Sequence, residues 1–308
     1  MAYLVRHRLL WIGLILAQCG NDSRAQETAV LRATHTASAE SDTQQSPGQL
    51  VRFAQIPTVI GDRVVQRIGT ELELHTVIKQ AGQISHDSQA SIRRRQEREV
   101  EVLEVVDGRA RRARVTYHLS REMSPGNPNP AEELAQPVEG KSYLIARAEE
   151  QLLVTDLEGA IPPRAEYELV LSSMENFGNP SALAELLLSR PLQVGERLEV
   201  PRELAVEMMG MQQFGVVQRF DLELQSLRKV EDRDCAVFAA RIATQGKPDN
   251  PLRVRAQGEV VIEIATTRTI QATLRGPMTL ATLEQGVQHT ATGDLLLAVE
   301  SKYHTTAP

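Results

Sequence analysis

Cysteine and aromatic residues are scarce in this chain of 308 residues, which has two Cys, one Trp and 4% aromatic residues. Trp11 and Cys19 both lie near the N-terminus, so Cys235 is the only cysteine beyond it. A single cysteine cannot form a disulfide within the chain, which excludes a small fold held by disulfides. The core must therefore consist of Val, Leu, Ile, Ala and Met, and we expect Cys235, in the apolar run DCAVFAARI, to be a buried, inert thiol.

The N-terminus lacks an apolar run long enough to cross a bilayer. Leu9–Ala17 holds nine apolar or glycine residues, whereas a membrane-spanning helix needs roughly 20. Arg6 and Arg8 precede this run and small residues follow it, as in a secretory signal peptide. We predict a signal peptide over residues 1–25 and export to the periplasm or out of the cell, because Ser23 and Ala25 are small residues at the positions that cleavage requires.

Cys19 offers an alternative to removal of the whole leader. Lipoprotein processing requires a small residue just before the cysteine, and Leu16 and Ala17 suit that pattern while Gln18 does not. Ordinary cleavage directly after Cys19 also fits the small residues there. Lipid anchoring through Cys19 therefore stays as the alternative, and membrane attachment is expected only in that case.

Composition divides the rest of the chain in two. Residues 26–50 are rich in Ser, Thr, Ala and Gln, which is typical of a flexible linker. Residues 51–308 are long enough for one large domain or two small ones. The formal charge is −6, and it becomes −8 once residues 1–25, with three Arg and one Asp, are removed. This acidic balance argues against a nucleic-acid-binding protein, which would carry a basic surface.

Recognisable catalytic and metal-binding motifs are absent from the sequence. It contains no G-x-S-x-G elbow, H-E-x-x-H, phosphate-binding loop, G-x-G-x-x-G or C-x-x-C, and no histidines at a metal-ligand spacing on a helix. We therefore predict no catalytic residue, no metal and no cofactor. An active site assembled from residues far apart in the chain remains the alternative, because a single sequence cannot display one.

Alternation of apolar and polar residues dominates the domain. ELELHTVIK places Leu72, Leu74, Thr76 and Ile78 on one face, and FDLELQ repeats the pattern. EVVIEIATTRTIQATLRG holds two such runs joined by a short turn at Thr267. Period-two runs of this kind predict half-buried antiparallel strands, about nine to eleven of them by the same pattern rules.

The middle of the chain has the proline and glycine spacing of helices instead of the alternation of strands. Proline opens and glycine or proline closes three segments, which is typical of helix ends. We predict short helices over about 164–177, 180–190 and 202–211, with Asn179 as the cap of the second. The fold class is mainly β (α+β), a large curved antiparallel sheet or half-barrel with these helices inserted in the middle. The segments VIGDRVV and QVGERLEV are weakly similar, so residues 55–160 and 190–303 could be related halves. The fixed period that marks a sequence repeat is missing.

Arginine is concentrated between residues 91 and 121. Arg93, Arg94 and Arg95 form a candidate anion-binding patch. The others are expected in a hairpin at the turn Asp107-Gly108. That hairpin would place Val106 opposite Arg109, Glu104 opposite Arg111, Val102 opposite Ala113, Glu101 opposite Arg114 and Val100 opposite Val115. The following loop, MSPGNPNPAEELAQPVEG (123–140), is rich in proline, and a loop of this length is either functional or mobile.

The predicted helices carry more apolar side chains than such short elements can bury among themselves. We expect them to lie against the concave face of the sheet, as a permanent plug or as a lid over an apolar cavity, because Met also lines adaptable binding surfaces. The candidate ligand-binding residues are Leu187, Leu204, Met208, Met209, Met211 and Phe214.

The stretches RPLQVGERLEVP and GEVVIEIATTRTIQATLRG carry a resemblance. With the leader and linker, they resemble uncharacterised exported bacterial proteins that have one large β domain, over residues 55 to 300. At the level of fold alone, the chain is similar to lipoprotein carriers, whose curved sheet wraps around short helices. Neither resemblance implies a functional residue. The sequence thus predicts a non-enzymatic cell-envelope module that binds an apolar small molecule or an envelope protein, with an enzyme or a purely structural protein as alternatives.

Overall fold

The computed structural model describes residues 48–124, 132–149, 151–179, 181–209, 216–246, 252–284 and 286–304. The predicted signal peptide, Cys19 and nearly all of the predicted linker lie outside these residues, as do Met211 and Phe214. The backbone of Met208 and Met209 is described, but their side chains are not.

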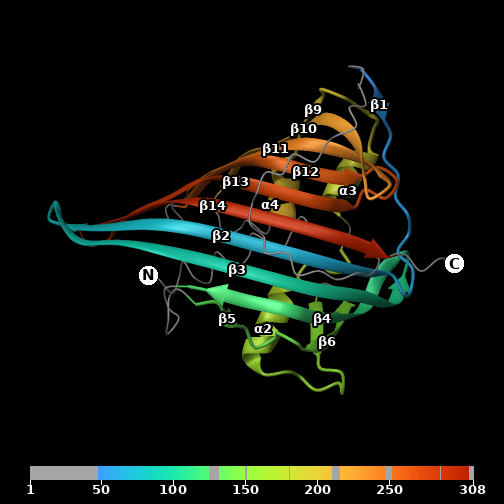
Figure 1. Cartoon of the computed structure of the whole chain (residues 1–308), viewed down its shortest axis with the longest axis horizontal. Coiled ribbons are helices and arrows are strands. Elements are labelled where there is room, and N and C mark those ends of the chain that lie inside the picture. Colours follow the sequence, from blue (N-terminus) through green and yellow to red (C-terminus); the bar gives the residue numbers. More distant parts are fainter. Residues whose placement is uncertain are drawn as a thin grey trace.

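A single antiparallel sheet dominates the fold (Figure 1). Its strands run in the spatial order β7-β6-β4-β3-β2-β14-β13-β12-β11-β10-β9, and β5 pairs with β4. The bounds are β2 (Arg63–Gln80), β3 (Gln83–Val106), β4 (Arg109–Met123), β5 (Leu134–Ala135), β6 (Ser142–Ala148), β7 (Gln151–Thr155), β9 (Arg197–Glu199), β10 (Val216–Val230), β11 (Arg233–Gln245), β12 (Arg253–Glu263), β13 (Thr269–Glu284) and β14 (Val287–His304). The predicted large antiparallel sheet is confirmed.

The number of strands was predicted too low. The described residues hold fourteen strands, including the separate pair β1 (Leu50–Val51) and β8 (Leu192–Gln193). The additional strands are two or three residues long. A segment of that length is too short to display a period-two pattern, so only its pairing partner identifies it as a strand.

Three helices are described, and all three lie between β7 and β10 as predicted. They are α2 (Arg164–Ser173), α3 (Ala182–Leu188) and α4 (Arg202–Met209). The cap of α3 was predicted wrongly, because it is Ser181 rather than Asn179 whose side chain accepts a hydrogen bond, from the Ala184 backbone N–H at 3.3 Å. Helix α2 ends at Ser173, and the chain continues in turns to Gly178.

The two predicted halves contribute to the same sheet. Strands β2 to β7 form one meander and β9 to β14 another, and the first and last long strands, β2 and β14, pair over 18 positions from Arg63–His304 to Gln80–Val287. The chain from β2 to β14 is therefore one continuous sheet. A common origin of the two halves stays a prediction.

The hairpin of β3 and β4 has the predicted register at four of its five pairs. Asp107 and Gly108 both have positive φ, as a two-residue hairpin turn with right-handed strand twist requires. Glu104 pairs with Arg112 and not with Arg111, because the ladder is irregular on both sides of Glu104. A bulge of this kind inserts one residue into one strand, which sequence alternation alone does not reveal.

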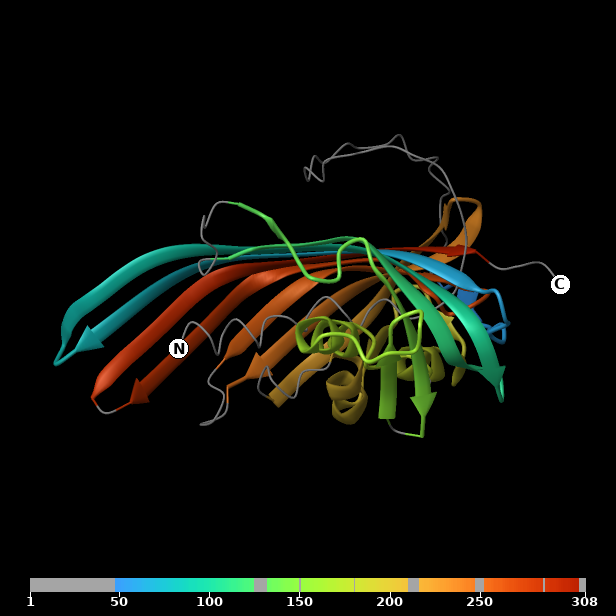
Figure 2. The same ribbon diagram turned by 90° about the horizontal axis from the view of Figure 1, so that it is seen from below.

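The sheet is arched, and the three helices lie on its concave side (Figure 2). Helices α3 and α4 pack with strands β10 to β14 in one apolar cluster that includes Leu183, Leu187 and Ala205. Helix α2 belongs to a second cluster, with Val170 beside residues of β4, β6 and β7. The arch therefore has two apolar cores on its concave side, one for each set of helices.

Candidate functional site

The two faces of the sheet differ in chemistry. Side chains alternate between faces along each strand, and the outward, convex side of β2, β3 and β4 carries paired charges. Arg67 lies 2.8 Å from Glu97, and Arg114 and His118 contact carboxylates of β3. The inward side is largely apolar under the helices. A molecule that binds by apolar contact would therefore meet the concave face.

Two of the predicted ligand-binding residues, Leu187 and Leu204, have described side chains, and they differ in burial. Leu187 is 1% exposed and lies in the first apolar cluster, while Leu204 is half-buried against that cluster. The predicted position of α3 and α4 against the concave face is confirmed by these contacts. Leu187 fills the core, as the plug version of the hypothesis requires, and the ligand-binding role of the predicted set stays a prediction.

Replacing Leu187 by alanine should destabilise the protein by about 2–5 kcal/mol, because deletion of a buried leucine side chain loses its apolar transfer energy and leaves a cavity. Leu188→Ala is the matched control, since Leu188 is 37% exposed on the same helix and should cost under about 1 kcal/mol. Urea unfolding followed by far-UV circular dichroism measures both. A loss at position 187 no larger than at 188, with altered binding of an apolar fluorescent probe, would contradict the plug and favour the lid.

The long hairpins continue the sheet beyond the helices. In Figure 2 the ends of β2, β3, β13 and β14 extend past α2, α3 and α4 and bend toward the concave side. By strand alternation and register, this part of the concave face presents half-buried apolar or glycine residues, which we call the distal strip, and, nearer the hairpin turns, the polar residues Thr76, His86, Ser88, Thr282 and His289. The strip consists of Leu74, Ile78, Ala90, Ile92, Leu280, Ala291 and Gly293.

An open pocket of about 710 Å³ lies over the same four strands. Its lining includes Leu74, Ala90, Met278 and Gly293, together with their neighbours on each strand, which are Glu73, His75, Gln89, Ser91, Pro277, Thr279, Thr292 and Asp294. The pocket and the distal strip occupy the same length of the sheet, but eight of the twelve lining residues are in phase with the convex side, so the pocket does not mark the concave face.

A row of polar residues, buried except for the half-buried Arg94, separates the two apolar cores. Along the concave side of β3, Arg94, Gln96 and Arg98 follow Ile92 and precede Val100. Arg98 is 3% exposed and donates hydrogen bonds to Gln66 Oε1 at 3.0 and 2.7 Å and to the Ser173 carbonyl oxygen of α2. The Tyr117 hydroxyl, from β4, contacts Ser173 Oγ.

The row continues to the edge of β4. Gln96 Nε2 donates to Ser120 Oγ at 3.4 Å, Ser120 Oγ to Gln136 at 2.8 Å, and Gln136 Nε2 to Glu122 at 3.0 Å. We call Gln66, Arg94, Gln96, Arg98, Tyr117, Ser120 and Ser173 the polar belt. Buried polar groups are costly unless they are hydrogen-bonded, so this belt fixes helix α2 to the sheet through specific partners.

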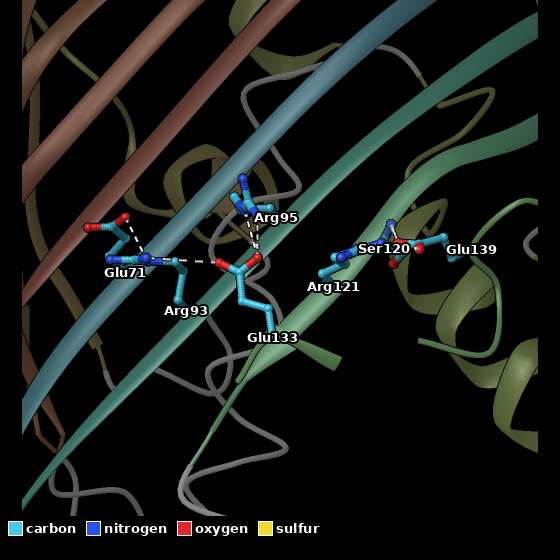
Figure 3. A network of polar contacts seen from close by, with 7 residues as sticks. All are labelled: Glu71, Arg93, Arg95, Ser120, Arg121, Glu133 and Glu139. Carbon is cyan, nitrogen blue, oxygen red and sulfur yellow. Dashed lines mark hydrogen bonds and ion pairs between the residues drawn. The ribbon is translucent and has the colours of Figure 1, made fainter. Parts of the chain in front are cut away.

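The three arginines of the candidate anion patch lie on two different faces of the sheet, because side chains alternate along a strand. Arg93 and Arg95 point to the convex side, where Arg93 Nε lies 3.0 Å from Glu71 and Arg95 Nε 3.0 Å from Glu133 (Figure 3). Arg94 points to the concave side, in the polar belt. The three arginines thus do not form one patch on one face, although anion binding by any of them stays a prediction.

The loop 123–140 is attached to this region at its described end. Glu133 contacts Arg93 and Arg95, and Glu139 accepts hydrogen bonds from the Ser120 N–H at 2.8 Å and from Arg121 (Figure 3). The Ser120 N–H and the Arg121 guanidinium hold the pKa of Glu139 below its ordinary value against the opposing effect of burial. Residues 132–140 are therefore held on the sheet by charge, and residues 125–131 lie outside the described part.

Other titratable groups have structural explanations. Glu166, at the start of α2, accepts hydrogen bonds from Lys141 Nζ at 2.7 Å and from the Tyr143 hydroxyl at 2.6 Å, and these bonds lower the pKa of Glu166. Cys235 is 1% exposed, as predicted, and burial raises the pKa of its thiol to about 11. A thiol in that state is a poor nucleophile. Within the described residues, no three His, Cys, Asp or Glu side chains could hold a metal ion together.

The polar belt was missed at the level of sequence. Gln66, Gln96 and Arg98 occupy positions where strand alternation points inward, and all three are under 5% exposed. A polar residue in phase with buried apolar neighbours was the available signal, but a run of arginines was interpreted as a surface instead. None of the helices in the described residues is long and apolar enough to span a membrane.

Comparisons with known proteins give a structural similarity at low sequence identity. No family model and no curated protein matches the chain. Among solved structures, the chain is similar to one titled "Lipid-protein interactions in lipovitellin", at 8% sequence identity and a TM-score of 0.32, over 81% of this chain and 26% of that one. The chain thus spans about a quarter of that structure's length. A similarity at this level carries no argument about function.

Proposed function

We propose that this protein is an exported binding protein that holds an apolar molecule against the concave face of its sheet, on the distal strip. The observation that carries the proposal is the difference between the two faces. The convex side carries ion pairs, whereas the concave side continues the apolar core with Leu74, Ala90, Ile92 and Leu280 before it turns polar at Thr76, Ser88 and Thr282.

The energetics favour an apolar ligand at this place. Burial of apolar surface yields about 25 cal/mol per Å², so a chain-like molecule gains affinity from each half-buried side chain that it covers. Ligand sites are mostly apolar, with a few polar groups that fix orientation, and the polar belt lies at the end of the distal strip. Export rests on the N-terminal pattern alone, and lipid anchoring through Cys19 is its alternative.

Mass spectrometry of the protein purified under native conditions tests the proposal most directly. It measures the processed N-terminus and any co-purified apolar molecule in one experiment. The proposal expects cleavage near residue 25 and a bound lipid-like mass that organic solvent extracts. An unprocessed N-terminus would contradict export.

Ala90→Glu should abolish binding of an apolar probe, with at least a tenfold loss of affinity. Ala90 lies on the concave side, directly across from Leu74 in the ladder between β2 and β3, so the new carboxylate would have to be desolvated under the ligand. Gln89→Glu is the matched control, because the neighbouring residue points to the convex side. Fluorescence titration with an apolar dye measures both variants. Equal loss in both, or loss only in the control, would place the ligand elsewhere and overturn the proposal.

A further inference from the structure

Strand β7 is one open edge of the large sheet. The strand order ends at β7 on one side and at β9 on the other, and Figure 1 shows β6 and β9 at opposite borders. All of β7 pairs with β6, from Leu144–Thr155 to Ala148–Gln151, and no other described residue forms a hydrogen bond with β7. Every second residue of such a strand directs its N–H and C=O groups away from the paired neighbour, so β7 presents backbone groups that a further strand can pair with.

The opposite edge carries the features that prevent pairing with another molecule. Strand β9 has only three residues, and two of them are the charged Arg197 and Glu199. Strand β10, which extends past β9, has an irregular register and then Arg228 and Lys229. Charged side chains and bulges protect an open edge in this way. Strand β7 has neither, because its sequence QLLVT is uncharged and its ladder has no register shift.

Exposed apolar side chains accompany the edge at β7. The residues on either side of Leu153 are buried in the second apolar cluster, so Leu153 points to the convex side, where it is 51% exposed. The next loop closes at the end of β7, with the Asp156 N–H 2.8 Å from the Ala160 carbonyl oxygen, and it adds Leu157 and Ile161, which are 57% and 78% exposed. One exposed apolar side chain is common on a surface, but three beside an uncharged open edge mark a contact surface.

The sequence of β7 is complementary to a second copy of itself in the antiparallel direction. About a two-fold axis at Leu153, Leu153 faces the same residue of the second copy, Leu152 faces Val154, and Gln151 faces Thr155. Apolar residues thus oppose apolar residues, polar residues oppose polar ones, and no like charges meet within the strand. An axis perpendicular to the sheet also keeps the concave sides of both copies on the same side, so that Leu152 and Val154 stay inward in both.

We propose that two copies of this chain associate through β7, which pairs antiparallel with β7 of the second copy about a two-fold axis at Leu153. The sheet then continues from one molecule into the next. A second copy fits this edge because the same five residues satisfy both sides of the contact, as a two-fold interface requires. Strands of this length form a small contact, so the dimer depends on protein concentration.

Sedimentation velocity over a range of concentrations tests the association. The purified protein should shift from monomer to dimer as its concentration rises, and about 0.5 M NaCl should leave the shift in place because β7 carries no charge. Leu153→Lys should abolish the dimer, since two lysines would then oppose each other across the axis. Leu283→Lys is the matched control, because Leu283 is 75% exposed at the end of the β13–β14 hairpin and should not affect the dimer.

Cysteine variants test the register. Residues directly opposite each other in an antiparallel pair have Cα atoms about 4.5–5.5 Å apart, which a disulfide can span. With Cys19→Ser in the background, the only native thiol left is Cys235, which is 1% exposed. On mild oxidation, Leu153→Cys should form a disulfide-linked dimer. Gln151→Cys mixed with Thr155→Cys should form one that neither variant forms alone, as measured by non-reducing electrophoresis.

The contrary outcomes are distinct. A monomer at every concentration, without a cross-link at position 153, would overturn the proposal. A dimer that Leu153→Lys weakens no more than Leu283→Lys does would place the contact elsewhere on the molecule, with the same consequence. A cross-link of Gln151→Cys with itself, and not with Thr155→Cys, would indicate parallel strands and contradict the two-fold axis at Leu153. If Leu153→Lys does not fold, the cysteine variants still decide the question.

Discussion

Gly276→Ala should destabilise the protein by about 4 kcal/mol or more, a loss that only a few mechanisms produce. A Cβ atom at position 276 would lie 2.0 Å from the Arg255 carbonyl oxygen and 2.9 Å from the Ala256 Cα, both in the backbone of β12. No rotation of a side chain relieves a clash with backbone. Strands β12 and β13 would have to separate between the pairs Val254–Met278 and Gln257–Arg275.

Two further glycines make the same approach. A Cβ at Gly258 would lie 1.8 Å from the Thr273 carbonyl oxygen, and one at Gly293 would lie 2.0 Å from the Glu73 carbonyl oxygen. Gly258 lies on β12, Gly276 on β13 and Gly293 on β14, three neighbouring strands of the sheet. Glycine inside a strand weakens it unless a close backbone approach or a bend requires it. We infer that this group of glycines permits the curvature of the sheet.

Gly69→Ala is the matched control, because Gly69 lies inside β2 and its added Cβ would meet no described atom within 4 Å. It should cost nothing, or stabilise the protein by up to about 1 kcal/mol by restricting the unfolded chain. Urea unfolding with far-UV circular dichroism compares the two variants. If Gly276→Ala loses no more than Gly69→Ala, the close approach is relaxed easily and the curvature has another cause.

Local patterns predicted the strands and helices because each depends on neighbours in sequence. Leu72 and Leu74 alternate with polar residues along one strand, and proline and glycine mark the helix ends. A curved sheet was predicted, but the glycines that permit its curvature could not be identified, since the need for glycine at position 276 arises from β12, a different strand. The same holds for the bulge at Glu104, which depends on the ladder to β4.

The candidate site was only partly predictable for the same reason. Alternation alone could have separated Arg94 from Arg93 and Arg95, because β3 was identified as a strand near them. The contact of Arg95 with Glu133, which is 38 residues away, depends on where a proline-rich loop returns to the sheet. Helices α3 and α4 were expected on the concave face because their apolar side chains had to be buried somewhere, and the sheet was the larger partner.

Arg268→Met should destabilise the protein by about 3–5 kcal/mol, because it leaves a buried carboxylate without its cation. Arg268 and Asp62 are 8% and 1% exposed, their side chains lie 3.4 Å apart, and 206 residues separate them in sequence. The Arg268 guanidinium also lies 5.4 Å from the centre of the Tyr303 ring. The pair thus connects the entry of β2 to the turn between β12 and β13.

An exposed pair provides the control for this prediction. Arg228 and Glu259 lie closer, at 2.8 Å, but both are well exposed, so Arg228→Met should cost at most about 1 kcal/mol. Asp62→Asn in the Arg268→Met background should recover part of the loss, since it removes the buried charge that the first change left uncompensated. Urea unfolding of the single and double variants gives the coupling energy. A double variant no more stable than Arg268→Met alone would show that the charge of Asp62 is not the cause of the loss, because asparagine can still accept the hydrogen bond that Asp62 accepts from the Val59 N–H at 3.2 Å.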